Sequence, residues 1–173
     1  MSKTFFTSDT HFGHFNIIRY CDRPFETVAE MDEELIKRWN AVVKPEDTVW
    51  HLGDFSFYMS KEKVTSIVKQ LNGTIYLVKG NHDKKPNQWY RDCGFKEIYD
   101  RPVMYNTFVL LSHEPQEFFC CGPYVNAFGH VHNSNMFETY GKNSACACTE
   151  RHQFAPVEES EFFSNWIEEG ENE

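Results

Sequence analysis

Five apolar runs in this sequence each end in side chains that can offer lone pairs to a metal ion. The runs span residues 4–8, 48–52, 74–78, 107–111 and 125–128. The polar residues that follow them, in chain order, are Asp9, His11, Asp54, Asn81, His82, Asp83, His113, His130 and His132. One such ending would be an ordinary cap or turn residue. Five in succession indicate a shared chemical site.

The types of these side chains favour a pair of divalent cations. Imidazole, carboxylate and amide oxygen form a borderline-hard set of ligands that suits Mn²⁺, Fe, Zn²⁺ or Ni²⁺, with Mn²⁺ as the first expectation. Asp54 stands alone after its run, where its two carboxylate oxygens can bridge two ions. Asn81 adds a neutral oxygen that does not titrate.

The spacing of the other residues supports the same interpretation. Alternate residues of an extended segment point to the same side. Asp9 and His11 can therefore hold one ion together. His130 and His132 can each face the site, one toward each of two adjacent ions.

The five runs must be strands whose ends meet at one edge. They are rich in β-branched and aromatic residues and have the length of strands. Between the first three runs, helical periodicity predicts helices over about 28–43, with Thr27 as N-cap, and about 61–71, with Ser60 as N-cap. This order predicts parallel βαβ units, which bind ligands at the carboxyl ends of their strands.

The rest of the chain completes an α/β fold. A third helix is expected from Pro86 to Gly94, and a last amphipathic turn over 162–167. From about residue 95 the runs follow one another without helices, which favours antiparallel pairing. We therefore expect one domain over residues 1–173, with two mixed sheets face to face, helices outside and a frayed acidic end at 168–173.

The charge and the termini limit the classes of partner. With 17 Lys and Arg against 26 Asp and Glu, the formal net charge is −9. Such a surface repels polyanions, so long nucleic acid is an unfavourable ligand. No run approaches the 18 apolar residues of a membrane span, and the start of the chain lacks a signal-peptide pattern. We expect a cytoplasmic protein without membrane association.

The six cysteines agree with a reducing compartment and free thiols. Cys146 and Cys148 fall on one face of an extended segment, where small buried thiols are ordinary core residues. Together with the pair Cys120 and Cys121 they leave zinc binding as an alternative, although neither spacing is the CxxC of zinc ribbons.

The ordered pattern DxH, GD, GNHD, H and GHxH resembles the calcineurin-like metallophosphoesterase superfamily. The match runs from residue 4 to about 132, and residues 11–25 further resemble its small, uncapped bacterial and phage members. The resemblance implies a four-layer αββα sandwich with a binuclear metal centre. It implies a first ion held by Asp9, His11, Asp54 and His132, and a second held by Asp54, Asn81, His113 and His130.

A mechanism can be outlined for such a centre. Two cations about 3.5–4 Å apart can generate a bridging hydroxide that attacks phosphorus in line. His82 is the candidate general acid for the leaving alkoxide, and Asp83 could orient its ring. The alternative for both residues is a structural role as caps of the short helix that follows Pro86.

Three residues are candidate substrate contacts. His14 lies in the same loop as His11, with a solvent-facing loop histidine as the alternative. Arg19 and Arg23 follow the first strand, where a guanidinium would suit a phosphate. For both arginines the alternative is ion pairing with the acidic helix that follows. His51, inside a run, is expected to be a core or supporting histidine.

The sequence favours hydrolysis of small phosphate esters, and phosphodiesters of the nucleotide or cyclic-nucleotide type over monoesters. The chain is barely longer than its motifs require, which leaves no room for a cap domain that encloses a polymer. Two alternatives remain. One is a non-catalytic interaction module with the same fold, and the other is a nuclease within a larger complex, which would need a basic groove.

Overall fold

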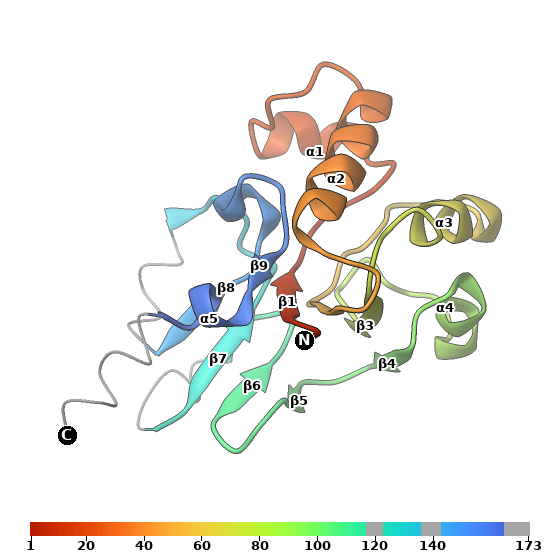
Figure 1. The fold of residues 1–173 in the computed structure, drawn as a ribbon. Coiled ribbons are helices and arrows are strands. Elements are labelled where there is room, and N and C mark those ends of the chain that lie inside the picture. Colours follow the sequence, from red (N-terminus) through yellow and green to blue (C-terminus); the bar gives the residue numbers. More distant parts are fainter. Residues whose placement is uncertain (117–122, 136–142, 165–173) are drawn as a thin grey trace.

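The computed structural model describes residues 1–116, 123–135 and 143–164. Its first sheet contains five strands in the order β4-β3-β2-β1-β9 (Figure 1). Their bounds are β1 Thr4–Thr7, β2 Thr48–His51, β3 Thr74–Val78, β4 Glu97–Tyr99 and β9 Val157–Glu158. The first four pair in parallel, and β9 pairs antiparallel to β1. The predicted βαβ units are confirmed.

Helices connect the parallel strands of this sheet. They are α1 Phe15–Tyr20, α2 Val28–Val42, α3 Lys61–Val68 and α4 Asn87–Cys93. The predicted N-caps of α2 and α3 are confirmed, since the hydroxyls of Thr27 and Ser60 accept hydrogen bonds from the first turns of these helices. Helix α4 ends at Gly94, whose φ of 114° is left-handed. Helix α1 was not predicted, because its six residues are too few for a periodic signal.

The second sheet has the order β5-β6-β7-β8. Its strands are β5 Val103–Met104, β6 Val109–Leu111, β7 Val125–Phe128 and β8 Ser144–Cys146. Only β5 and β6 are antiparallel; β6, β7 and β8 are parallel. The expectation of antiparallel pairing in this half is therefore largely wrong. Parallel strands need a crossover of about a dozen residues, and the segments 112–124 and 129–143 supply this length without the helical periodicity that we looked for.

Two apolar cores separate the layers. One contains residues of the helices and the first sheet, among them Leu35, Trp39 and Ile75. The other lies between the two sheets, where Phe6 of β1 meets Leu111 of β6 and neighbouring apolar residues. This arrangement confirms an α/β sandwich with two mixed sheets.

The end of the described chain packs against the first sheet. Helix α5, Glu159–Phe162, is a single turn, and the Phe162 ring stacks on Phe6 with a centroid separation of 5.1 Å. Residues outside the described ranges include Cys120, Cys121, Trp166, Ile167 and the acidic end 168–173.

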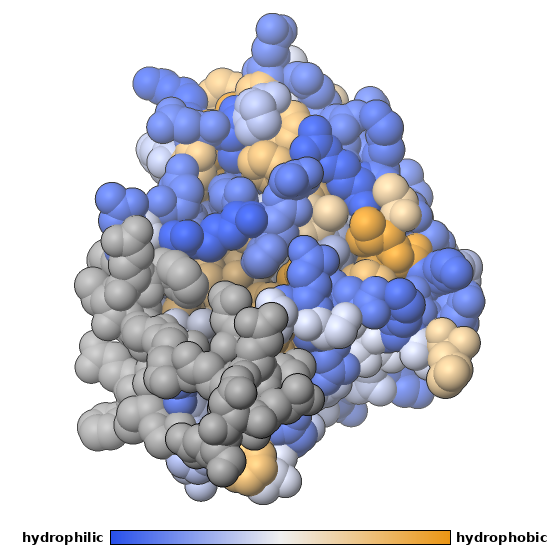
Figure 2. All heavy atoms as spheres, turned by 60° about the vertical axis from the view of Figure 1, so that its left-hand side comes forward, coloured by the Kyte–Doolittle hydropathy of each residue, from blue (hydrophilic) through white to orange (hydrophobic). Residues whose placement is uncertain are grey.

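The surface agrees with the polar composition of the chain. Figure 2 shows a face on which hydrophilic side chains predominate and apolar ones form separate patches. Among the described helices, none is both long and apolar enough to cross a membrane.

A buried ion pair joins the beginning of the chain to its end. Arg23 follows α1, and Glu150 lies in the 3₁₀ helix η3, Thr149–His152. The Nη2 of Arg23 lies 2.7 Å from Oε1 of Glu150, and the side chains are 0% and 4% exposed. The same guanidinium donates to the backbone carbonyls of Thr10 and Asp9 at 2.9 and 2.6 Å. Arg23 therefore fixes the loop after β1.

Replacing Arg23 with Ala should lower the free energy of unfolding by about 3–5 kcal/mol, because it breaks the buried ion pair with Glu150 and removes the donor to the loop carbonyls. Urea denaturation of the wild type and the variant measures this difference. Arg91→Ala is the control, since Arg91 pairs with Glu97 at the surface and its loss should leave stability nearly unchanged. Equal effects of the two substitutions would contradict the structural role of Arg23.

Candidate metal centre

The polar residues singled out in the sequence meet at one edge of the sandwich. Asp9 and His11 follow β1, Asp54 follows β2, and Asn81 follows β3. His113 follows β6, and His130 and His132 follow β7. Because β1–β3 run in parallel, as do β6 and β7, the carboxyl ends within each sheet lie side by side.

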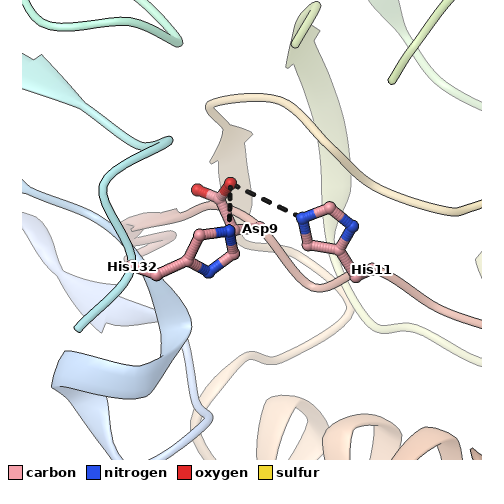
Figure 3. Close-up of side chains that lie close together, drawn as sticks. All are labelled: Asp9, His11 and His132. Carbon is pink, nitrogen blue, oxygen red and sulfur yellow. Dashed lines mark ion pairs between the residues drawn. The ribbon is translucent and has the colours of Figure 1, made fainter. Parts of the chain in front are cut away.

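One group of side chains surrounds Asp9. Figure 3 shows the rings of His11 and His132 directed at its carboxylate. Oδ1 of Asp9 lies 3.8 Å from Nε2 of His11 and 3.6 Å from Nε2 of His132. Their ligand atoms all lie within 4.8 Å of one another, as one metal ion requires.

A second group surrounds His113. Its Nε2 lies 3.5 Å from Oδ2 of Asp54 and 3.0 Å from Oδ1 of Asn81. Nδ1 of His130 lies 3.1 Å from the same Asn81 oxygen. Oδ2 of Asp54 is also 3.6 Å from Nε2 of His11, so this carboxylate stands between the two groups.

Both groups bring potential ligand atoms close together, and in the first group two of these atoms lack a hydrogen-bond partner. Nδ1 of His113 lies 2.8 Å from the carbonyl oxygen of Leu52, which can only accept, so Nδ1 carries the proton. In the neutral ring, Nε2 then directs a lone pair at the oxygen of Asn81. In the first group, Oδ1 of Asp9 and Nε2 of His11 are buried without any hydrogen-bond partner. Divalent cations would relieve both arrangements, so the residues fit them.

The electrostatics of His11 and Asp54 suit ligation. Burial lowers the pKa of His11 well below its usual value, and His132 and Arg23 add to this effect. The imidazole of His11 is therefore neutral and keeps its lone pair. Burial raises the pKa of Asp54, and the nearby Asp9 carboxylate contributes. A cation at this position would favour the ionised form of Asp54.

Backbone strain is concentrated in the same residues. Nine non-glycine residues of the described chain have positive φ, and five of them are predicted ligands. These five are Asp9 (57°), His11 (51°), Asp54 (56°), His130 (70°) and His132 (49°). Each such conformation is unfavourable by about 1–3 kcal/mol and persists where the surroundings enforce it, commonly at functional sites.

Two glycines allow the backbone to approach the carboxylates. A Cβ on Gly80 would clash with the side chain of Asp54, and one on Gly129 would clash with the carboxylate of Asp9. Both glycines belong to the sequence motifs, GNHD and GHxH. Close packing of backbone against the acid side chains explains why these motifs contain glycine.

Hydrogen bonds orient the two acids. Oδ2 of Asp9 accepts from the hydroxyl of Ser8 at 2.6 Å and from the backbone N–H of His130 at 2.9 Å, which leaves Oδ1 for a cation. Oδ1 of Asp54 accepts from the backbone N–H of His82 at 2.8 Å, which leaves Oδ2 between the two groups. Each carboxylate thus has one oxygen fixed and one directed into the site.

The side chain of Asp83 makes different contacts from those expected. Its buried carboxylate accepts from the backbone N–H groups of Asp54, Gly80 and Phe55 at 2.6, 2.9 and 3.3 Å. Burial raises its pKa to about 7, and the Asp54 carboxylate adds to the shift. The expectation that Asp83 orients the His82 ring is therefore corrected, because its oxygens are used to shape the loop that carries Asp54.

His82 stands at the rim of the centre. Its side chain is 35% exposed, and its Nε2 lies 3.8 Å from Oδ2 of Asp54. The ring makes edge contacts with His11 and Phe57 at centroid separations of 5.4 and 5.0 Å. His82 is therefore close enough to the centre to contact a bound ester.

The three candidate substrate contacts have different environments. His14 is buried, its ring stacks on Phe57 at 3.8 Å, and burial lowers its pKa to about 4. Arg19 is exposed in the last turn of α1. Arg23 is buried and bonded to Glu150 and the loop backbone, so its expected phosphate contact is corrected to a structural role.

Glu150 is a supporting residue that the sequence did not reveal. Its Oε1 lies 2.9 Å from Nδ1 of His132, so it orients the ring whose Nε2 faces Asp9. Burial opposes protonation of His132, but hydrogen bonds with Cys21 and Glu150 and the charge of Asp9 raise its pKa to about 11. The segment 149–154 carries no motif, and the contact with His132 is visible only in three dimensions.

Two other histidines and the thiols have structural surroundings. His51 is buried, with Nε2 3.0 Å from the hydroxyl of Thr10, which confirms the expected core histidine. Cys146 and Cys148 are buried free thiols, as predicted. Cys21 lies near His132 and Glu150 in a further group of possible ligand atoms. Because Arg23 already neutralises Glu150, that group is better explained as support for His132.

Several known proteins resemble this chain in sequence. The calcineurin-like phosphoesterase family model matches residues 2–173. An uncharacterized protein of Methanocaldococcus jannaschii is 41% identical over 146 residues, which cover 81% of this chain and 74% of that protein. The gene 66 protein of Mycobacterium phage L5 is 38% identical over 95 residues, which cover 54% of this chain and 45% of the phage protein.

A solved structure agrees with these matches. The crystal structure of a protein of unknown function from Aquifex aeolicus superposes with a TM-score of 0.73 and 28% sequence identity. The superposition covers 93% of this chain and 97% of that one. With its family match over almost the whole sequence, the chain belongs to the calcineurin-like phosphoesterase family.

Proposed function

We propose that this chain is a metal-dependent phosphoesterase that hydrolyses small soluble phosphate esters, with nucleotide-type or cyclic-nucleotide phosphodiesters as the favoured class. The observation that supports this best is the convergence of unpartnered lone pairs. Asp9 and His11 hold buried atoms without a hydrogen-bond partner, and three further potential ligand atoms, Nε2 of His113, Nδ1 of His130 and Oδ1 of Asn81, lie 3.0–3.2 Å apart. Such an arrangement is costly unless cations bind there.

Two divalent cations, with Mn²⁺ as the first candidate and Fe, Zn²⁺ or Ni²⁺ as alternatives, suit these ligand types. The residues that would hold them are Asp9, His11, Asp54, Asn81, His113, His130 and His132. When bound, such ions supply an activated water and neutralise charge on the phosphoryl oxygens.

His82 is suited to protonate the leaving oxygen. Its backbone N–H is tied to Asp54, which fixes the residue next to the centre. Its partly exposed ring lies at the rim, apart from the converging lone pairs, and can exchange protons with solvent. General acid catalysis by a positioned histidine typically contributes about 10²–10⁴ in rate.

The charge and the surroundings of the site favour small substrates over polymers and catalysis over scaffolding. A net charge of −9 opposes the approach of long nucleic acid. A non-catalytic interaction module does not require five strained polar residues around one point, two of them with unpartnered buried atoms. This argument favours the hydrolase over the non-catalytic alternative.

Asp54→Asn should abolish binding of at least one metal ion and reduce turnover of bis(p-nitrophenyl) phosphate, because the shared carboxylate charge is lost. Elemental analysis and the assay measure both effects. Asp47→Asn is the control, since Asp47 is equally buried but precedes β2 at the other end, where it accepts from the N–H groups of Lys3 and Lys44. An Asp54 variant with two bound metals and full activity would refute the bridging role.

His82→Ala should slow hydrolysis of alkyl phosphate esters by roughly 10²–10⁴ and that of p-nitrophenyl esters much less, because a good leaving group needs no proton. Steady-state rates on a series of esters that differ in leaving-group pKa measure this dependence. His152→Ala, a change at a histidine bonded to the Cys146 carbonyl, serves as the control. Uniform losses on all esters would exclude His82 as the acid.

Glu150→Gln should weaken metal affinity about 10–100-fold, because His132 loses the carboxylate that orients it. Calorimetric titration of the metal-free protein with Mn²⁺ measures the change. Glu158→Gln, at a surface carboxylate paired with Lys3, should leave the affinity unchanged. An unaltered affinity in the Glu150 variant would mean that His132 needs no such support.

A further inference from the structure

A cavity of about 240 Å³ opens beside the candidate metal centre. Its walls come from the loop after β2, from the loop that connects β3 to α4, and from α4 itself. Aromatic side chains of the first loop and of α4 line it, and His82 of the second loop belongs to its wall. The same two loops carry Asp54 and Asn81, so the cavity and the centre are parts of one surface.

The position of His82 indicates which part of a substrate would enter this cavity. An acid that protonates the leaving oxygen must contact that oxygen in the bound ester. The group attached to the leaving oxygen then extends away from the metal centre past His82. Since His82 lies between the centre and the cavity, the cavity is where this group would lie.

The aromatic walls of the cavity are held in place by other rings. Phe57 is half-buried and stacks on His14 with a centroid separation of 3.8 Å and an interplanar angle of 15°. Trp89 is half-buried and meets Tyr90 edge-on at 5.0 Å. Rings fixed in this way can offer a face or edge to a planar group with little loss of side-chain freedom.

The polar part of the cavity wall is basic. Lys84 and Lys85 are exposed and line it, and Nζ of Lys85 lies 6.0 Å from the Trp89 ring centroid. None of the described residues that line the cavity is acidic, although the chain carries a net charge of −9. This local reversal of charge favours an anionic ligand.

We propose that this cavity binds the leaving group of the substrate, and that the leaving group is a planar aromatic ring with an anionic substituent, as in a nucleoside monophosphate. The inference rests on the proposed function. The volume lies below the 300–1,000 Å³ of pockets for drug-sized ligands, so it suits one ring system and not a polymer. In the reaction, the bond from phosphorus to the leaving oxygen breaks, that oxygen takes a proton from His82, and water supplies the oxygen that phosphorus gains.

A binding experiment tests the cavity independently of turnover. The metal-free protein is titrated by calorimetry with adenosine 5′-monophosphate, ribose 5-phosphate and adenosine. Stacking of a base on an aromatic side chain corresponds to roughly 5- to 100-fold in affinity. Adenosine 5′-monophosphate should therefore bind about 5- to 100-fold more tightly than ribose 5-phosphate, and also more tightly than adenosine.

Variants assign this preference to the cavity. Trp89→Leu should remove most of the preference for adenosine 5′-monophosphate over ribose 5-phosphate, whereas Trp89→Phe should keep it because a ring remains. The double substitution Lys84→Gln and Lys85→Gln should weaken the binding of adenosine 5′-monophosphate more than the binding of adenosine. Lys69→Gln removes one positive charge at the exposed end of α3, and it should change neither the affinity for adenosine 5′-monophosphate nor that for adenosine. Circular dichroism of each variant confirms that it is folded.

The possible results separate this inference from the proposed function. Equal binding of the two phosphates by the wild type, or an unchanged preference in Trp89→Leu, would overturn the aromatic cavity. In parallel, the Mn²⁺-loaded wild type is assayed with bis(p-nitrophenyl) phosphate. Turnover without a binding preference for the nucleotide would refute only the proposal that the cavity binds the leaving group. Absence of turnover with each candidate cation would refute the hydrolase function on which the inference rests.

Discussion

The mutual repulsion of converging lone pairs is the constraint on which the rest of this structure depends. Asp9, His11 and Asp54 approach one another in a buried space, with atoms that find no donor within the described chain. Surrounding structure must hold these side chains close together. Parallel strands bring the loops together, glycines let the backbone pass close to the carboxylates, and backbone N–H groups fix one oxygen of each acid. The left-handed conformations of five predicted ligands, these three with His130 and His132, store free energy that ion binding would offset.

The support extends beyond the residues that would touch an ion. Asp83 uses its carboxylate to bind three backbone N–H groups around Asp54, and Glu150 orients His132. Arg23 then neutralises Glu150 and holds the loop after β1. These contacts explain why charged residues are buried close to a site that already contains two acids. They place the negative charge where cations would bind and balance the remaining charge with a guanidinium.

The sequence was sufficient for the features that depend on local chemistry. Strand ends, helix caps and the residues that meet at the sheet edge all follow from patterns of a few positions, as Thr27, Ser60 and Gly94 illustrate. Features that depend on long-range contacts were not accessible. The parallel pairing of β6, β7 and β8 was not predicted, because the sequence between these strands shows no helical periodicity. Arg23 was predicted to contact phosphate or to pair with the acidic helix, whereas it lies in the interior and pairs with Glu150, far along the chain. Asp83 was predicted to orient His82, whereas it accepts a hydrogen bond from the backbone of Asp54.

The Arg23–Glu150 pair also limits how far this chain can be shortened from its C-terminal side without losing the site. Every motif that identifies the family precedes residue 133, so a fragment that stopped there would retain the complete set of candidate ligands in its sequence. It would nevertheless lose β8, β9 and the carboxylate that steadies His132, and it would leave a guanidinium buried without its counter-ion. Truncated relatives that keep all five motifs would therefore be assigned to the family from their sequence and still be unable to assemble the candidate metal centre.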